Sequence, residues 1–176
     1  ALVLSKVVSR KLHGALGPFE VTIDTTKTIT QLVSTEPRSI GAGHRIVFQF
    51  NNPVTTLGSV TAINGQGNAL AGVTTSMSGN EVTVTLTAVP DNSRVTVQLN
   101  NVNGALSPAA SMGFLLGDVM ESRAVTAADI AATKSRLPVA SATTTSSNFR
   151  LDVNASGSIT TADVAIVKSQ AGKRLP

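Results

Sequence analysis

The sequence contains no cysteine, tryptophan or tyrosine, and charged residues make up only 14% of its 176 residues. Without cysteine, disulfide bonds, thiolate metal ligands and a cysteine nucleophile are all excluded. No run of 18 apolar residues occurs, so no membrane-spanning helix is expected. The net charge is +4, but the lysines and arginines are dispersed and no aromatic residues are interleaved among them. A nucleic-acid groove needs stacking aromatics as well as charge, so nucleic-acid binding is not expected.

The residues of an active site are also scarce, and no enzyme is predicted. The two histidines, His13 and His44, each stand beside a glycine, and we expect both to be solvated loop residues. The carboxylates of the first half of the chain are scattered singly, which gives no acid and base pair. No leader peptide is recognisable at Ala1, so the sequence is expected to be a mature chain or part of a longer one.

Residues 1–114 are rich in Val, Thr, Ser, Asn and Ala, which is typical of an extracellular β-sandwich. In the clearest strand, Glu81–Thr87, three apolar side chains alternate with threonines, as expected where one face of a sheet is buried. Further strands are expected at Leu2–Arg10, Phe19–Ile23, Arg45–Phe50, Val60–Ile63, Val73–Met77 and Arg94–Leu99. Several short strands without helices predict an antiparallel sandwich.

Two segments of this region carry a family resemblance. Ile46–Val54, which reads IVFQFNNPV, and Val95–Val102, which reads VTVQLNNV, are similar to bacterial immunoglobulin-like domains. The resemblance implies that residues 1–114 form an Ig-like β-sandwich that acts as a spacer or stalk.

The segment Asp152–Asp163 has the pattern of a calcium loop. Ca²⁺ takes six to eight oxygen ligands at about 2.3–2.6 Å, and a twelve-residue loop supplies them from positions 1, 3, 5, 7, 9 and 12. Gly157 stands at position 6, where the chain must bend with positive φ. The predicted ligands are Asp152, Asn154, Ser156, the Ser158 carbonyl, Thr160 (directly or through a water) and Asp163. The alternative is a metal-free turn that caps the following helix.

The same pattern occurs 34 residues earlier, at Asp118–Asp129, and about half of the aligned residues match through Ser135 and Ser169. An internal repeat of this kind indicates one supersecondary unit used twice. Met120 replaces the position 3 ligand and Arg123 the glycine, so this loop loses a donor and gains a positive charge. The remaining ligands are Asp118, Ser122, the Ala124 carbonyl, Thr126 and Asp129. From the residues alone, calcium binding and a metal-free turn are equally supported for this first loop.

Each loop is followed by a helical pattern, and the two copies together resemble a dockerin domain of type I, in which a half EF-hand occurs twice. The resemblance covers about residues 115–176 and implies an all-α domain that binds two Ca²⁺ ions and docks onto a cohesin module. The fold prediction is therefore a two-domain chain, with a β-sandwich at 1–114 and a dockerin-like domain at 115–176. Leu137-Pro138 is expected to end the first helix, and residues 140–147 to form an exposed linker.

The resemblance also implies which residues face the partner. They are Ala127, Ala128, Lys134 and Ser135 in the first copy, and Thr161, Ala162, Lys168 and Ser169 in the second. Residues seven positions apart return to the same side of a helix, which is consistent with one shared face. The alternative for both lysines is a solvated position on an amphipathic helix.

The predicted function is that of a non-catalytic attachment module of a secreted or surface bacterial protein, monomeric in isolation. It would dock onto a cohesin-type partner in polysaccharide-degrading or cell-surface assemblies. The alternative is a calcium-stapled end cap or spacer, packed on the β-sandwich and without a cohesin partner. The two hypotheses differ in whether the face with Lys134 and Lys168 is open or buried against residues 1–114. Carbohydrate binding by the sandwich is disfavoured, because sugars usually stack on exposed Trp or Tyr rings.

Overall fold

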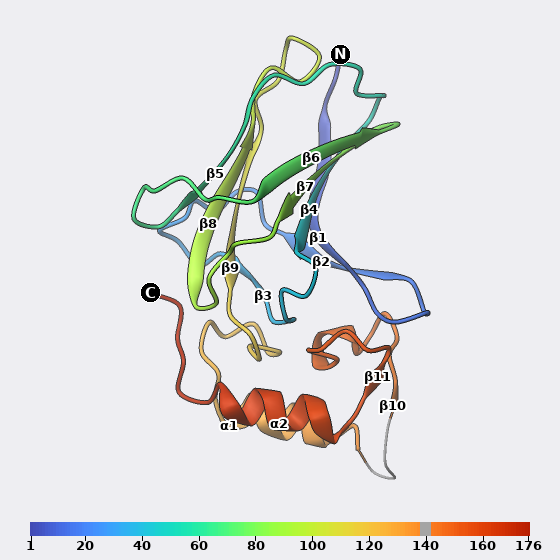
Figure 1. Ribbon diagram of the computed structural model, residues 1–176, viewed down its shortest axis with the longest axis vertical. Coiled ribbons are helices and arrows are strands. Elements are labelled where there is room, and N and C mark those ends of the chain that lie inside the picture. Colours follow the sequence, from blue (N-terminus) through green and yellow to red (C-terminus); the bar gives the residue numbers. More distant parts are fainter. Residues whose placement is uncertain (138–141) are drawn as a thin grey trace.

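In the computed structural model, which describes residues 1–137 and 142–176, the first part of the chain forms two β-sheets that face each other (Figure 1). The first sheet has the order β2-β1-β4-β7-β6, with β1 Leu4–Leu12, β2 Pro18–Ile23, β4 His44–Phe50, β6 Val73–Ser78 and β7 Glu81–Leu86. The second has the order β3-β9-β8-β5, with β3 Ser34–Glu36, β5 Val60–Asn64, β8 Ser93–Leu99 and β9 Ala109–Phe114. Strands β3 and β9 pair in parallel, so the prediction of a purely antiparallel sandwich is wrong at this pair; the other neighbours are antiparallel.

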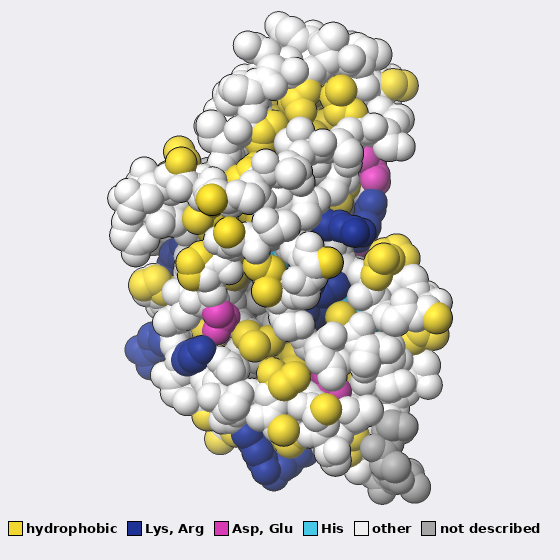
Figure 2. Space-filling view, viewed as in Figure 1, with side chains coloured by type: hydrophobic (Ala, Val, Ile, Leu, Met, Phe, Trp, Pro, Cys, Tyr) yellow, Lys and Arg dark blue, Asp and Glu magenta, His cyan; other side chains and the backbone are white. Residues whose placement is uncertain are grey.

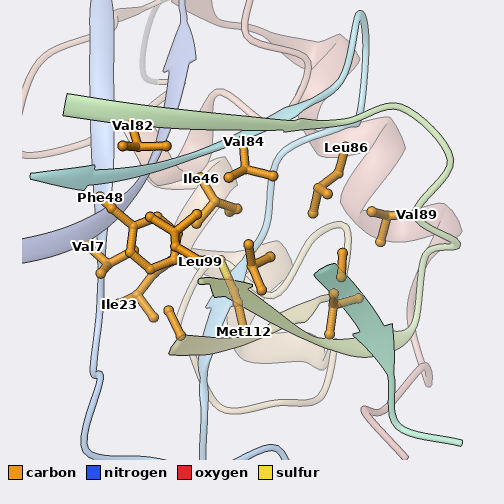
Figure 3. Close-up of a cluster of buried hydrophobic side chains, with 14 of the residues drawn as sticks. Val7, Ile23, Ile46, Phe48, Val82, Val84, Leu86, Val89, Leu99 and Met112 are labelled. Atoms are coloured by element: carbon orange, nitrogen blue, oxygen red, sulfur yellow. The ribbon is translucent and has the colours of Figure 1, made fainter. Parts of the chain in front are cut away.

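The hydrophobic core lies between these two sheets (Figure 3). In β7, Val82, Val84 and Leu86 are fully buried while the intervening side chains are partly exposed, as period-two alternation predicts. Phe48 enters the core from the first sheet and Met112 from the second. Each such side chain contributes about 1.5–3 kcal/mol on burial, so this layer is the main source of stability for the sandwich.

All seven predicted strands are present, with ends that differ by at most two residues from those expected. The sequence pattern missed β3 and β9 because neither alternates. Every residue of β3 is buried, and so are the last five of β9. Gly113 in β9 shows the reason, since a Cβ added there would overlap the side chain of Leu175 from the C-terminal tail. The immunoglobulin-like character of the sandwich stays a prediction.

The C-terminal part contains two helices that pack side by side, α1 Ala127–Lys134 and α2 Thr161–Ser169 (Figure 1). Each begins after a threonine that forms a capping box, Thr126 for α1 and Thr160 for α2. A short 3-10 helix, Phe149–Leu151, lies between the helices in sequence.

The expectation that this part is all-α was incomplete, because the structure adds a two-stranded sheet. In it, β10 Ala142–Thr143 pairs with β11 Ser158–Ile159, which belongs to the second loop. The paired strands are too short for a sequence pattern to reveal them. Helix α1 ends at Lys134, and residues 138–141, which include the first two residues of the expected linker, lie outside the described residues. The expectation of an exposed linker is wrong for Thr144, which is buried beside β10.

The C-terminal part has its own hydrophobic cluster, which also reaches into the sandwich. Leu115, Val125, Val153 and Val167 are buried in it, together with Val33 from the segment before β3. Backbone hydrogen bonds cross the same junction, including Ser39 N to the Val153 carbonyl at 2.7 Å. The two parts are therefore packed against each other; the boundary at residue 114 stays a prediction. Within residues 1–137 and 142–176, no helix is long and apolar enough to cross a membrane.

Candidate metal centre

The second loop folds around the carboxylate of Asp152, which is fully buried. Its Oδ1 accepts a hydrogen bond from Ser156 N at 2.9 Å. Its Oδ2 accepts hydrogen bonds from Gly157 N and from the Thr144 hydroxyl, both at 2.8 Å. The loop backbone is thus pinned to the first residue of the predicted ligand set.

The other end of the loop is held by Asp163, which is also fully buried. Its Oδ2 accepts a hydrogen bond from Thr160 N at 2.8 Å, as part of the capping box of α2. Its Oδ1 accepts a longer bond from Asn154 N at 3.3 Å. The carboxylate therefore caps the helix with one oxygen and turns the other toward the loop, as expected for an acidic residue in a first helical turn.

The middle of the loop bends as the sequence predicted. Gly157 has a φ of 95°, and a Cβ there would stand 3.1 Å from the His13 carbonyl oxygen. Ala155 also has a positive φ, 57°. Ile159 at position 8 is fully buried, as expected for a side chain that points away from the loop.

Three predicted ligand oxygens of the second loop are gathered by the Ser156 hydroxyl, which donates hydrogen bonds to the other two, at separations that calcium ligands can also have. The Ser156 hydroxyl is 2.9 Å from the Ser158 carbonyl oxygen and 3.4 Å from Asp152 Oδ1. Ligands held 2.3–2.6 Å from one ion and roughly at right angles lie about 3.5 Å apart, and closer at smaller angles. The described residues contain no group of three or more His, Cys, Asp or Glu side chains placed to hold a metal ion. A cation here would depend on hydroxyl, amide and carbonyl oxygens beside the two carboxylates, a donor set that suits hard Ca²⁺.

Two corrections concern the histidines, which were expected to be solvated. His13 is fully buried, and its Nδ1 lies 2.7 Å from Asp152 Oδ2. His44 is also buried and packs against the ring of Phe114 at a centroid distance of 4.6 Å. Burial lowers the pKa of His44 to about 4, so it is neutral at pH 7. A glycine neighbour indicates a turn but carries no information on what packs over that turn.

The charge balance of the second loop favours a bound cation. Burial raises the pKa of Asp163, and the nearby negative charge of Asp152 adds to the effect. For Asp152, burial is outweighed by hydrogen bonds from His13, Thr144 and the loop amides, which lower its pKa. Two buried carboxylates close enough to repel each other are stabilised by a positive charge placed between them.

The first loop repeats these contacts atom for atom. Asp118 Oδ1 accepts from Ser122 N at 2.8 Å, and Oδ2 accepts from Arg123 N at 2.9 Å. Asp129 accepts from Met120 N at 3.0 Å and from Thr126 N at 2.8 Å. The repeated hydrogen bonds show that the duplication in sequence is a duplication in structure.

The two departures of the first loop have different consequences. Met120 is 57% exposed and offers only a thioether where the second loop has an amide oxygen, so this loop lacks one oxygen donor. Arg123 has a φ of 67°, the positive value that position 6 requires. Its guanidinium leaves the loop and donates to the Val33 carbonyl at 3.1 Å. The added positive charge is therefore held on the sandwich and outside the loop. The missing oxygen donor at Met120 is the main feature that would weaken calcium binding by this loop.

The eight residues expected to face a partner are all exposed: Ala127, Ala128, Lys134, Ser135, Thr161, Ala162, Lys168 and Ser169. They lie at the beginnings and ends of α1 and α2. The face with Lys134 and Lys168 is thus open and is not buried against residues 1–114.

Several polar residues that contact the loops were not predicted from the sequence. Thr35 donates to Asp118 Oδ2 at 2.8 Å, and Arg150 donates to the Asp118 carbonyl at 3.2 Å. At the second loop, His13 Nδ1 and the Thr144 hydroxyl lie 2.7 and 2.8 Å from Asp152 Oδ2. These residues lie outside both twelve-residue loops, so no spacing rule connects them to the ligands.

Fold and site together define a duplicated loop-and-helix module, in which two similar loops each precede a capped helix. Residues 116–170 match the model of the dockerin type I domain family, which supports a dockerin domain at the C-terminal end of the chain. A dockerin is a non-catalytic, calcium-binding module that docks onto cohesin. A comparison of the chain with curated proteins gives no match.

Proposed function

We propose that this chain is a calcium-binding attachment module of a secreted or surface bacterial protein, without catalytic activity. It docks onto a cohesin-type partner in a polysaccharide-degrading or cell-surface assembly. The observation that supports this most is the exposure of all eight expected contact residues within a segment that matches the dockerin type I model.

Calcium has a structural part in this proposal. Asp152, Asn154, Ser156, the Ser158 carbonyl and Asp163 would hold the ion in the second loop, with Thr160 contributing directly or through a water. When bound, the ion supplies the positive charge that joins these oxygens. The loop residues themselves fix the start of α2 through the capping box. A metal-loaded loop would therefore hold the helix, and with it the docking face, in one orientation.

The end-cap alternative rests on a different observation, the packing of the C-terminal part on the sandwich. Lys173 pairs with Asp91 at 3.0 Å, and Leu175 is buried against β9. These contacts leave the ends of α1 and α2 uncovered. Packing and docking thus use different surfaces, and the open face favours attachment over a purely structural cap.

The charge of this face suggests the chemistry of the partner surface. Lys134, Arg136 and Lys168 are exposed, and Figure 2 shows basic side chains at the end of the molecule formed by the helices. The neighbouring positions are small, because Ala127, Ala128 and Ala162 carry single methyl groups. We therefore expect a partner surface with acidic or polar groups that approaches the helix starts closely.

The test is calorimetric titration of isolated cohesin modules into the chain with Ca²⁺, and again with excess chelator. Binding in calcium alone is expected, and the double variant Lys134→Glu with Lys168→Glu is expected to weaken it by about tenfold or more. The matched control, Lys27→Glu with Arg45→Glu, makes the same change of charge on the sandwich and is expected to have little effect. If no cohesin module binds while calcium binding is intact, the end-cap function replaces attachment.

A further inference from the structure

The turn between β1 and β2 lies directly against the second loop. Gly14 N donates to the Ala155 carbonyl at 3.0 Å, and a Cβ on Gly14 would overlap the Ser156 carbonyl oxygen. From the other side, a Cβ on Gly157 would press on the His13 carbonyl oxygen. The two backbones are thus in contact at two glycines, and the turn cannot shift without disturbing the loop.

His13 extends from this turn to the ligand Asp152, and its protonation is fixed by its two neighbours. Its Nε2 lies 3.1 Å from Arg38 Nη1. A guanidinium can only donate, so Nε2 accepts and carries no proton. The imidazole proton is therefore on Nδ1, which donates to Asp152 Oδ2 at 2.7 Å.

Behind His13 stands a row of buried polar groups that belong to the sandwich. Arg38 donates from Nε and Nη2 to the two carboxylate oxygens of Glu36, at 2.7 and 2.8 Å. Glu36 also accepts from the Ser9 hydroxyl. The side chains of Glu36, Arg38 and His13 are at most 1% exposed. The ring of Phe19 meets the imidazole edge to face at 5.1 Å, so the orientation of His13 is fixed from both sides.

The first loop has a corresponding contact from the sandwich. The Thr35 hydroxyl of β3 donates to Asp118 Oδ2 at 2.8 Å. In both loops, Oδ2 of the first aspartate is held by a sandwich residue, while Oδ1 accepts from the amide of the serine at position 5. Because the arrangement occurs twice, with different residues, it is a feature of how the two parts are joined.

We propose that the β-sandwich positions the calcium ligand Asp152 through His13, so that calcium binding in the second loop and packing of the β1–β2 turn are coupled. The proposal rests on calcium binding by this loop as set out under the proposed function. His13 is a positioning residue, because it acts on the ion through Asp152. Coupling between two equilibria is reciprocal. If the packed turn raises the calcium affinity of the second loop by some factor, bound calcium favours the packed turn by the same factor.

The first experiment compares calcium dissociation constants by calorimetry for the full chain and its variants. Asp152→Ala identifies the binding event of the second loop. Loss of an outer partner of a metal ligand typically costs 10–100-fold in affinity, so His13→Phe is expected to weaken that event by about this factor. His13→Asn places an amide donor where Nδ1 stands and is expected to restore most of the affinity. His44→Phe is the matched control, since His44 is also buried and makes no hydrogen bond to either loop.

The second experiment uses the unaltered chain, so it decides the matter even if His13→Phe does not fold. Nitrogen-15 spectra of the imidazoles are expected to show His13 protonated on Nδ1, with a signal that moves as calcium fills the second loop. The His44 signal is expected to stay. A proton on Nε2 of His13, or a His13 signal unmoved by calcium, contradicts the coupling.

The outcomes separate this proposal from the function on which it rests. If the unaltered chain binds no calcium, or binding is unaffected by Asp152→Ala, the calcium function itself is wrong. If binding is lost in Asp152→Ala but His13→Phe binds with unchanged affinity, calcium binding stands and the coupling through His13 is wrong.

Discussion

Replacing Glu36 by glutamine tests the buried polar row that supports the second loop. Glu36 and Arg38 form an ion pair at 2.7 Å in which both side chains are fully buried. Glu36→Gln keeps the shape of the side chain and removes its charge. Arg38 then stays buried without a counter-ion, so the free energy of unfolding is expected to fall.

The size of the loss can be worked out in two ways. Burial alone would raise the pKa of Glu36, but the neighbouring Arg38 lowers this pKa from 4.5 to about 2. The difference corresponds to about 3 kcal/mol. Breaking a buried ion pair by removing one partner costs about 3–5 kcal/mol in other proteins. Both routes predict a loss of about 3 kcal/mol at pH 7.

The difference in stability between the unaltered chain and Glu36→Gln is expected to decrease as the pH falls. A carboxylate whose pKa is lowered on folding contributes stability above its unfolded pKa, here 4.5, and loses it as the pH falls toward about 2. The difference between the two proteins should therefore shrink to about 1 kcal/mol at pH 3. The assay is urea unfolding followed by circular dichroism, since the chain has no Trp or Tyr for fluorescence. A loss below about 1 kcal/mol at pH 7, or a difference that does not change with pH, would refute the reasoning.

Three further predictions concern other parts of the chain. Burial lowers the pKa of His44 from 6.5 to about 4, so the stability contributed by neutral His44 is full above pH 6.5 and should fall by about 3 kcal/mol as the pH drops to 4. In urea unfolding at a series of pH values, His44→Gln should flatten this part of the stability curve. An unchanged curve would contradict the lowered pKa of His44. Leu175→Ala should cost about 2–4 kcal/mol in urea unfolding, because Leu175 is 6% exposed and fills the space beside Gly113; a cost under 0.5 kcal/mol would mean that the tail does not pack there. Gly157→Ala should lower stability by about 1–2 kcal/mol and weaken calcium binding, because φ is 95° and the new methyl group presses on the His13 carbonyl oxygen. A calcium affinity that calorimetry finds unchanged in this variant would contradict the prediction.

The parts of the fold that follow simple periodicity were predictable. The strand β7 alternates between valines and threonines because one face is buried, and the sequence therefore shows it. Helices α1 and α2 were predictable because each copy of the repeat shows a helical pattern after its loop, with the closing aspartate of the loop in the first helical turn. Strands β3 and β9 could not be predicted, since Leu175 and the first loop cover their second face and remove the alternation.

The candidate site shows the same division between local and distant information. The residues within each loop share a fixed spacing, so Asp152 and Asp163 could be paired from the sequence alone. His13 lies 139 residues from Asp152 in sequence and meets it only because the β1–β2 turn packs on the second loop. Arg123 was expected to place a positive charge in the first loop, but its side chain leaves the loop for the Val33 carbonyl. Contacts of this kind depend on tertiary packing, which no local pattern records.

The central claim is that the C-terminal part holds calcium in its second loop. The most direct measurement is calorimetric titration of Ca²⁺ into the chelator-treated chain and into the Asp152→Ala variant. We predict at least one calcium site in the unaltered chain, and the loss of one site in the variant. Absence of binding, or the same number of sites in both proteins, would contradict the account.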